Sequence, residues 1–182
     1  MRITISGPPG SGKSTTCLGL SKVLGCRQVM FGQVFREMAA DKGISVAELG
    51  AMAENDPSID RELDKTILET AKNCSEIVLE SRLSAHLTKR KGIDAFRIYI
   101  HASPDVRMNR ICSREGEEYD EIRRKTLERE ESEAKRYKQH YDIDIKDLSV
   151  YDLIINTDDL TPEEVIDKIL GALDERNACE RF

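Results

Sequence analysis

Short apolar runs alternate with longer amphipathic segments along the chain. The runs are rich in isoleucine, valine and leucine, and they predict five strands, over residues 2–6, 27–30, 76–81, 96–101 and 152–156. The segments between them predict seven helices, over residues 13–23, 33–41, 46–54, 58–73, 104–114, 119–137 and 162–176. Alternation of strands and helices is typical of an α/β fold, so we expect a parallel five-stranded sheet covered by helices on both faces.

A glycine-rich loop follows the first predicted strand and leads into the first predicted helix. Residues 7–14 fit the phosphate-binding pattern G-x-x-x-x-G-K-[ST], which predicts a P-loop NTPase fold. Glycines let successive backbone N–H groups point at phosphate oxygens. Lys13 supplies charge for the β- and γ-phosphates and is a candidate catalytic residue, and the Ser14 hydroxyl can ligate Mg²⁺. The expected nucleotide-binding residues here are Gly7, Pro8, Pro9, Gly10, Ser11, Gly12, Lys13, Ser14 and Thr15.

Two arginines follow neighbouring predicted strands. Arg36 comes shortly after the second strand, and Arg82 comes directly after the third. Ligands of such folds bind at the carboxyl ends of the strands, and arginine holds phosphate in a planar fork. The pair is therefore expected to hold the phosphate of an acceptor molecule, although each arginine could instead form a surface ion pair.

The connection between the second and third predicted strands is unusually long. Residues 32–73 exceed the usual crossover by far and contain about three predicted helices, which indicates a small substrate-binding flap. Asp60 and Asp64 share one face of its last helix. They could accept hydrogen bonds from a base amino group, but we favour a solvated face for them.

Arginines also gather on two neighbouring predicted helices. Arg107, Arg110 and Arg114 share a face of the first, and Arg129 and Arg136 share a face of the second. With a short hinge between them, these helices are expected to form a lid that stabilises charge on a transferred phosphoryl group and excludes water. The alternative is an exposed helix with Glu–Arg ion pairs. We expect Arg110, Arg114, Arg129 and Arg136 to face the site, and Arg123 and Arg124 to face solvent.

Composition narrows the kinds of partner. With 28 basic and 34 acidic residues the formal net charge is −6, which argues against a nucleic-acid partner. No apolar run approaches the roughly 18 residues of a membrane span, and we expect neither a membrane anchor nor a signal peptide. No feature indicates an obligate protein partner. The scattered cysteines are expected to be buried free thiols in a reducing cytoplasm: Cys17, Cys26, Cys74, Cys112 and Cys179.

Seven stretches of the chain resemble the archaeal-type cytidylate kinases, which are P-loop nucleoside monophosphate kinases. They are residues 7–15, 32–37, 56–61, 78–83, 110–115, 129–137 and 141–157. The resemblance implies reversible transfer of the γ-phosphoryl group of ATP to CMP or dCMP, with Mg²⁺. It also implies a single domain over residues 1–182, made of a core (1–31, 74–111 and 141–176), a monophosphate-binding flap (about 32–73) and a lid (about 112–140).

The resemblance implies roles for residues of the acceptor site. Arg36 and Arg82 would hold the acceptor phosphate, and Glu133 would lie near the acceptor nucleoside. The expected acceptor-binding residues are completed by Gly32, Asp60 and Arg61.

It also implies roles for the donor site and the lid. Arg110 would stack on the donor adenine, and Arg114 would contact phosphates. Arg129 and Arg136 would reach the phosphates of both substrates across the lid, so that Arg114, Arg129 and Arg136 join Lys13 as candidate catalytic residues. The loop that lines the donor base would contain Asn156 and Thr157.

The chain departs from the family pattern at two places, and two other functions compete. Phe31 stands where relatives carry a small hydroxyl residue, and the segment 84–86, which contains His86, replaces Ala-Gly and an aromatic. One competing function is a kinase for another small acceptor, such as AMP, UMP, shikimate or a coenzyme A precursor. The other is a nucleotide-dependent switch, but the D-x-x-G and N-K-x-D motifs of GTPases do not occur.

Overall fold

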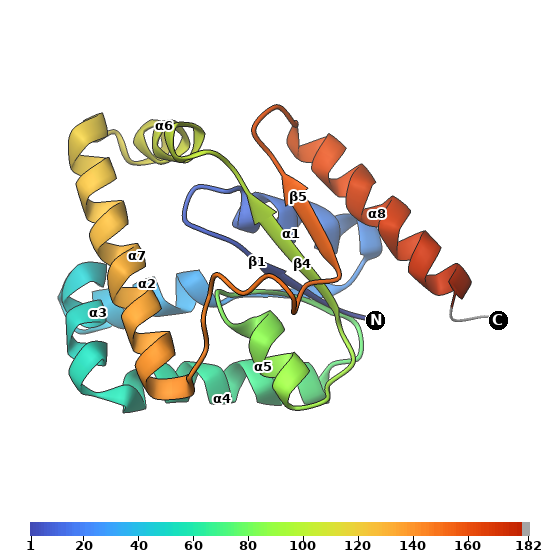
Figure 1. Ribbon diagram of the computed structural model, residues 1–182, viewed down its shortest axis with the longest axis horizontal. Helices are drawn as coiled ribbons and strands as arrows, with labels where there is room; N and C mark the ends of the chain where they lie inside the picture. Colours follow the sequence, from blue (N-terminus) through green and yellow to red (C-terminus); the bar gives the residue numbers. More distant parts are fainter. Residues whose placement is uncertain (180–182) are drawn as a thin grey trace.

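The computed structural model, whose described residues are 1–179, is built around a five-stranded parallel sheet in the order β2-β3-β1-β4-β5 (Figure 1). The strands are β1 (Arg2–Ser6), β2 (Arg27–Met30), β3 (Ile77–Glu80), β4 (Phe96–His101) and β5 (Leu153–Asn156). The helices are α1 (Lys13–Leu24), α2 (Phe31–Asp41), α3 (Val46–Asn55), α4 (Pro57–Asn73), α5 (Ser84–Arg90), α6 (Pro104–Glu115), α7 (Tyr119–Tyr141) and α8 (Pro162–Cys179). The parallel α/β sheet predicted from the sequence is confirmed.

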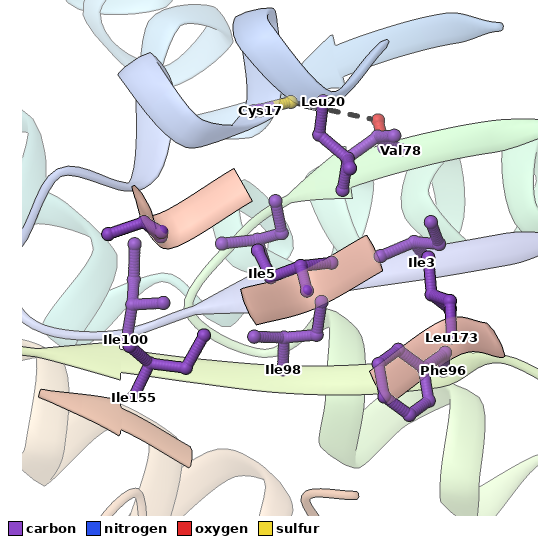
Figure 2. Close-up of a cluster of buried hydrophobic side chains, with 12 residues drawn as sticks. Ile3, Ile5, Cys17, Leu20, Val78, Phe96, Ile98, Ile100, Ile155 and Leu173 are labelled. Carbon is purple, nitrogen blue, oxygen red and sulfur yellow. Dashed lines mark hydrogen bonds between the residues drawn. The ribbon is translucent and has the colours of Figure 1, made fainter. Parts of the chain in front are cut away.

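Alternation along the strands divides the core between the two faces of the sheet. Ile3 and Ile5 of β1 point to the face covered by α1 and α8, where they pack with Leu20 of α1 and Ile169 of α8 (Figure 2). On the opposite face, Leu79 of β3 packs in a second cluster with residues of α4, α5 and α7. Helices therefore cover both faces, and the sheet is held rigid beneath the loops that follow its strands.

Two predictions needed correction. The helix α5 was not predicted, because its seven residues are too few to show a helical period and no side chain caps its start. The cysteines are free, as predicted, but only Cys17 is buried, whereas Cys179 is exposed. Cysteine scarcely differs in pattern from other small residues on a helix, so spacing alone does not reveal which thiols are covered. Among residues 1–179, no helix is long and apolar enough to cross a membrane.

Candidate active site

The phosphate-binding loop joins β1 to α1 and approaches its neighbours too closely for any side chain at two positions. Gly7 has φ 152°, and a Cβ there would lie 2.0 Å from the carbonyl oxygen of Ile100. Gly10 has φ 78°, and a Cβ there would lie 2.6 Å from the carbonyl oxygen of Arg107. Only glycine fits both the left-handed backbone and the close approach, so β4 and α6 fix the path of the loop.

A cavity of about 430 Å³ opens above this loop. It lies at the carboxyl ends of the strands, as expected for a parallel α/β sheet. Cationic side chains dominate its lining, namely Lys13, Arg36, Arg82, Arg110, Arg114 and Arg129. Among its described lining residues the carboxylate is Glu80. This imbalance fits a ligand that carries several negative charges.

Lys13 lies at the base of the cavity and donates to the carbonyl oxygen of Pro8 at 2.8 Å. Burial lowers the pKa of Lys13 to about 7, an effect that nearby Arg82 and Arg129 strengthen and Glu80 and Glu133 oppose. A polyphosphate in the cavity would supply the missing negative charge and restore the charged ammonium.

Ser14 and Glu80 place oxygen atoms beside the loop. The Ser14 hydroxyl donates to Glu80 Oε2 at 3.4 Å, and Glu80, at the end of β3, is buried. Oxygen donors suit Mg²⁺, which is commonly held by one or two protein oxygens together with water and substrate phosphates. Among residues 1–179 no cluster of three or more His, Cys, Asp or Glu could hold a metal. Sequence reasoning missed Glu80, although an acid that ends a buried strand just before Arg82 was a usable signal.

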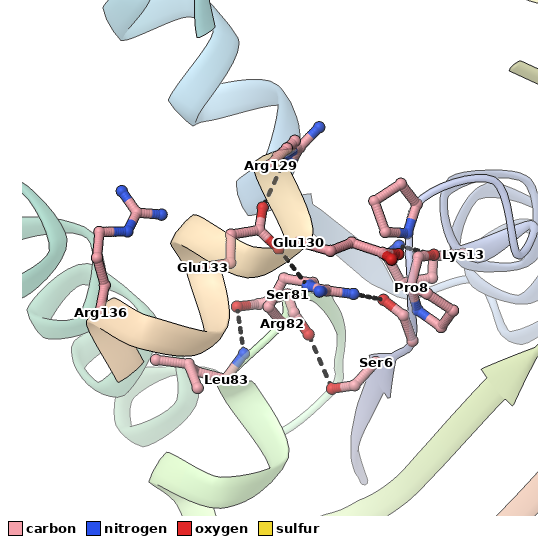
Figure 3. Close-up of polar contacts among 12 residues, drawn as sticks. Ser6, Pro8, Lys13, Ser81, Arg82, Leu83, Arg129, Glu130, Glu133 and Arg136 are labelled. Atoms are coloured by element: carbon pink, nitrogen blue, oxygen red, sulfur yellow. Dashed lines mark hydrogen bonds and ion pairs between the residues drawn. The ribbon is translucent and has the colours of Figure 1, made fainter. Parts of the chain in front are cut away.

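Glu133 of α7 holds two of the predicted phosphate-binding arginines. Its Oε2 lies 2.6 Å from Arg82 Nε, and its Oε1 accepts from Arg129 Nε at 2.8 Å (Figure 3). Arg82 also donates to the carbonyl oxygen of Gly7 at 2.7 Å. Burial alone would raise the pKa of Glu133, but attraction to Arg82 and Arg129 outweighs it and lowers the pKa to about 2. Glu133 is therefore ionised and neutralises arginines that a phosphate could occupy.

A second pocket of about 60 Å³ lies between α2, α4 and α7 and shares Gly32, Arg82 and Arg129 with the large cavity. Aromatic and aliphatic side chains line much of it, including Phe31 and Phe35. The small volume is far below the roughly 300 Å³ of typical ligand pockets, so this end of the site is closed in the structure.

Asp60 and Asp64 lie in this pocket and are 4% and 8% exposed, so the favoured solvated face is wrong. The helix α4 packs its acidic face against α7, where Arg136 Nε lies 3.5 Å from Asp60 Oδ2. Burial raises the pKa of Asp64 to about 6, with the nearby Tyr141 hydroxyl opposing the rise and Asp60 adding to it. The Oδ2 atoms of Asp60 and Asp64 have no hydrogen-bond partner among the described residues.

The other predicted arginines take different positions. Arg110 donates to the Thr157 side chain at 3.0 Å and to its carbonyl oxygen at 2.7 Å, which fixes Arg110 on the wall of the large cavity. Arg114 lines the same cavity and pairs with Glu115. Arg136 is buried in the second pocket, away from the large cavity.

Several predicted site residues lie outside both pockets. Arg61 and Asn156 are exposed and line neither. Gly7 and Pro8 line a different cavity, behind the loop. As expected, Arg123 and Arg124 are exposed, and Arg124 pairs with Glu121 and Glu128.

Phe31 and His86, which depart from the family pattern, are both buried, but they lie in different surroundings. Phe31 lines the second pocket, so an aromatic ring stands where a hydroxyl was usual. His86 packs edge-on against Tyr151, with ring centroids 5.8 Å apart, and lies outside the second pocket. His86 is therefore a core residue in this structure.

The helices α7 and α3 are in contact. Lys135 of α7 pairs with Glu54 of α3 at 2.5 Å, and a ring nitrogen of His140 lies 3.3 Å from the carbonyl oxygen of Ala53. The two helices lie side by side in Figure 1. These contacts join α7 to α3 outside the lining of the second pocket.

The parallel sheet, the glycine loop and the cationic cavity together define a P-loop nucleotide-binding protein. The chain belongs to the cytidylate kinase-like family, whose model matches residues 2–159. It is 49% identical to the cytidylate kinase of Methanothrix thermoacetophila over 86% of this chain and 88% of that protein. It is 45% identical to the cytidylate kinase of Halorubrum lacusprofundi, over 96% of this chain and 90% of that protein.

Similar solved structures support the fold alone. An uncharacterized protein from Eubacterium ventriosum matches with a TM-score of 0.70 at 16% identity, over 96% of this chain and 98% of that one. A shikimate kinase from Aquifex aeolicus matches with a TM-score of 0.61 at 18% identity, over 97% and 98%. At such identities the shared architecture carries no information about the substrate.

Proposed function

We propose that this protein transfers the γ-phosphoryl group of ATP to CMP or dCMP, giving ADP and CDP or dCDP. The observation that carries the proposal is the pair of adjoining pockets. A cation-lined cavity on the phosphate loop adjoins an acid-containing pocket, and Gly32, Arg82 and Arg129 line both. Membership of the cytidylate kinase-like family supports a nucleoside monophosphate as the acceptor.

The donor half of the site uses the phosphate loop and the wall around Thr157. Loop amides and Lys13 bind the phosphates of ATP, and Arg110, held by Thr157, flanks the base. Ser14 and Glu80 would hold Mg²⁺, which neutralises phosphate charge when bound.

The acceptor half uses the strand-end arginines. Arg36 lines the large cavity, and its guanidinium forms no ion pair within residues 1–179, so it is free to meet a phosphate. Arg82 and Arg129 reach the same phosphate once Glu133 moves from between them. The acceptor phosphate is already an anion, so the reaction needs positioning and charge stabilisation more than a general base.

The base of the acceptor would enter the second pocket. Asp60 and Asp64 offer oxygen atoms to a base amino group, and the rings of Phe31 and Phe35 offer it apolar surface. Since the pocket now measures about 60 Å³, the flap (about 32–73) must swing away from the lid (about 112–140) to admit a nucleotide, while the core stays fixed. Closure would then exclude water from the transferring phosphoryl group.

The proposed setting is the cytoplasm, with small nucleotides as partners. The free cysteines fit a reducing compartment. A coupled assay of ADP release tests the reaction: release should require both ATP and CMP. Equal release with ATP alone would indicate an ATPase and contradict the proposal.

Replacing Asp64 by asparagine should stabilise the protein at neutral pH. The pKa of Asp64 is raised to about 6 from 3.8, so its ionised form is disfavoured in the fold, and the wild-type free energy of unfolding falls as pH rises through this range. At pH 8, Asp64→Asn should raise that free energy by up to about 3 kcal/mol, and the gain should shrink toward zero as pH falls to about 4.

Urea unfolding at several pH values measures this effect, with Glu62→Gln on the exposed side of the same helix as the control. Asp64→Asn should also bind CMP more weakly, because a carboxylate oxygen facing the base is lost. A gain in stability that does not change with pH would show that Asp64 is not the titrating group.

A further inference from the structure

Three successive carbonyl groups of the phosphate loop accept hydrogen bonds from buried or enclosed cations. Arg82 donates to Gly7, Lys13 to Pro8, and Arg107 to Pro9 at 3.0 Å. Arg107, on α6, has a side chain that is only 8% exposed. Sequence reasoning placed Arg107 on the arginine face of its helix but gave it no role.

The Pro9 carbonyl differs from the other two in what its peptide carries. The Gly7 and Pro8 carbonyls each precede a proline nitrogen, which has no hydrogen. The Pro9 carbonyl precedes Gly10, so its peptide carries an N–H. In a planar trans peptide the C=O and the N–H point in opposite directions, and this peptide is trans. Because Arg107 donates to the Pro9 carbonyl oxygen, the Gly10 N–H points away from Arg107.

Pro9 and Gly10 both line one cavity, and the arginine that donates to the Pro9 carbonyl lines another. Gly10 lines the large cationic cavity, whereas Arg107 lines a separate cavity of about 300 Å³ behind the loop. The Gly10 N–H is thus directed to the side where phosphate would bind. The backbone of Arg107 also lies against Gly10, close enough that a Cβ on Gly10 would meet it at 2.6 Å. Both the main chain and the side chain of Arg107 therefore hold this one peptide.

The lid helix holds Arg107 in turn. Glu130 Oε1 on α7 lies 2.6 Å from Arg107 Nη1, the same nitrogen that donates to Pro9. Figure 3 shows Glu130 extending from α7 toward the loop, one turn before Glu133. Glu133 pairs with Arg82, which would bind an acceptor phosphate. Glu130 instead pairs with Arg107, which does not line the phosphate cavity. The Glu130–Arg107 pair can therefore persist while substrates bind.

We propose that Arg107 is a positioning residue for the phosphoryl donor: held by Glu130 of the lid helix, it orients the Pro9–Gly10 peptide so that the Gly10 N–H points at a donor phosphate. This inference rests on the proposed use of ATP. It makes α7 a support of the phosphate loop as well as a cover for the site.

The test is calorimetric titration of Arg107→Met with ADP and, separately, with CMP. The dissociation constant for ADP should rise about tenfold, the effect of one charge-assisted hydrogen bond acting through the loop, and that for CMP should stay within about twofold. Arg107→Lys should recover part of the affinity, and adding Glu130→Gln to Arg107→Met should cost nothing further, because Glu130 acts through Arg107. Arg124→Met, in an exposed ion pair of α7, is the matched control and should bind ADP normally.

The NMR resonance of the Gly10 amide distinguishes a positioning role of Arg107 from a purely structural one. ADP should shift this resonance strongly in the wild type and weakly in Arg107→Met, while the Gly12 amide responds equally in both. Normal ADP affinity with a wild-type Gly10 shift would overturn the proposal. If Arg107→Met does not fold, Arg107→Lys and Glu130→Gln carry the same test, and normal behaviour of both would overturn it. Failure of the wild type to bind ADP would instead refute the proposed kinase function itself, and the inference with it.

Discussion

Lys13→Ala should lower kcat by about 10²–10³-fold, the typical loss when one preorganised donor to the developing charge is removed. Lys13 lines the cationic cavity, and its ammonium group donates a hydrogen bond to the carbonyl oxygen of Pro8. In the proposed reaction its ammonium group binds the β- and γ-phosphates and stabilises the negative charge that develops during transfer. Steady-state kinetics with saturating ATP and CMP measures the effect.

The fold should survive this substitution. Burial lowers the pKa of Lys13 to about 7 from 10.5, so its charged form is disfavoured in the fold, and this cost to stability is present at pH 7 and below. Lys13→Ala should therefore unfold at the same temperature as the wild type or higher at pH 7. Lys22→Ala, an exposed change on the same helix, is the kinetic control. Near-normal turnover of a folded Lys13→Ala protein would refute the assignment.

Arg82→Met should raise the KM for CMP strongly and the KM for ATP much less. Loss of a charge-assisted hydrogen bond to the acceptor phosphate should cost about 1.5–3 kcal/mol, or about one to two decades in kcat/KM for CMP. Arg82 also pairs with buried Glu133, and breaking a buried pair by removing one partner destabilises by about 3–5 kcal/mol. The single variant is thus expected to lose stability as well as affinity.

The double variant Arg82→Met with Glu133→Gln separates these two effects. It leaves no unpaired carboxylate, so much of the stability should return, whereas the defect in CMP binding should remain. Arg36→Met, whose side chain is less enclosed, should reproduce the CMP defect with a smaller loss of stability. An equal rise in the KM of both substrates would show that Arg82 acts on the loop through its bond to Gly7 and not on the acceptor.

The sequence was most informative where the chemistry lies in consecutive residues. The phosphate loop needs glycines and a lysine at fixed spacing between a strand and a helix, so its place and the parallel α/β fold could be predicted directly. Arg110 and Arg114 follow one helical period, and both do line the cavity. Arg61 shows the limit of this reasoning. It was expected to bind the acceptor, yet it is exposed although Asp60 beside it in the chain is buried.

Features that arise from packing between distant elements could not be predicted. Asp60 and Asp64 are buried only because α4 meets α7, and polar residues on a helix face give no sign of such a partner. Glu133 and Glu130 lie in a helix whose composition is typical of a solvated one, yet each pairs with a largely enclosed arginine from another element. The helical period shows which side chains share a face, but not what that face meets.

The central claim concerns the acceptor, and a comparison of kcat/KM for CMP, dCMP, UMP and AMP at saturating ATP tests it most directly. The acid-containing pocket should favour bases that present an amino group to Asp60 and Asp64, and the flap should fit a pyrimidine. We therefore predict that CMP and dCMP exceed UMP and AMP by at least about tenfold, since each well-placed hydrogen bond to a charged group contributes about 1.5–3 kcal/mol. Equal values for CMP and UMP, or a preference for AMP, would contradict the account.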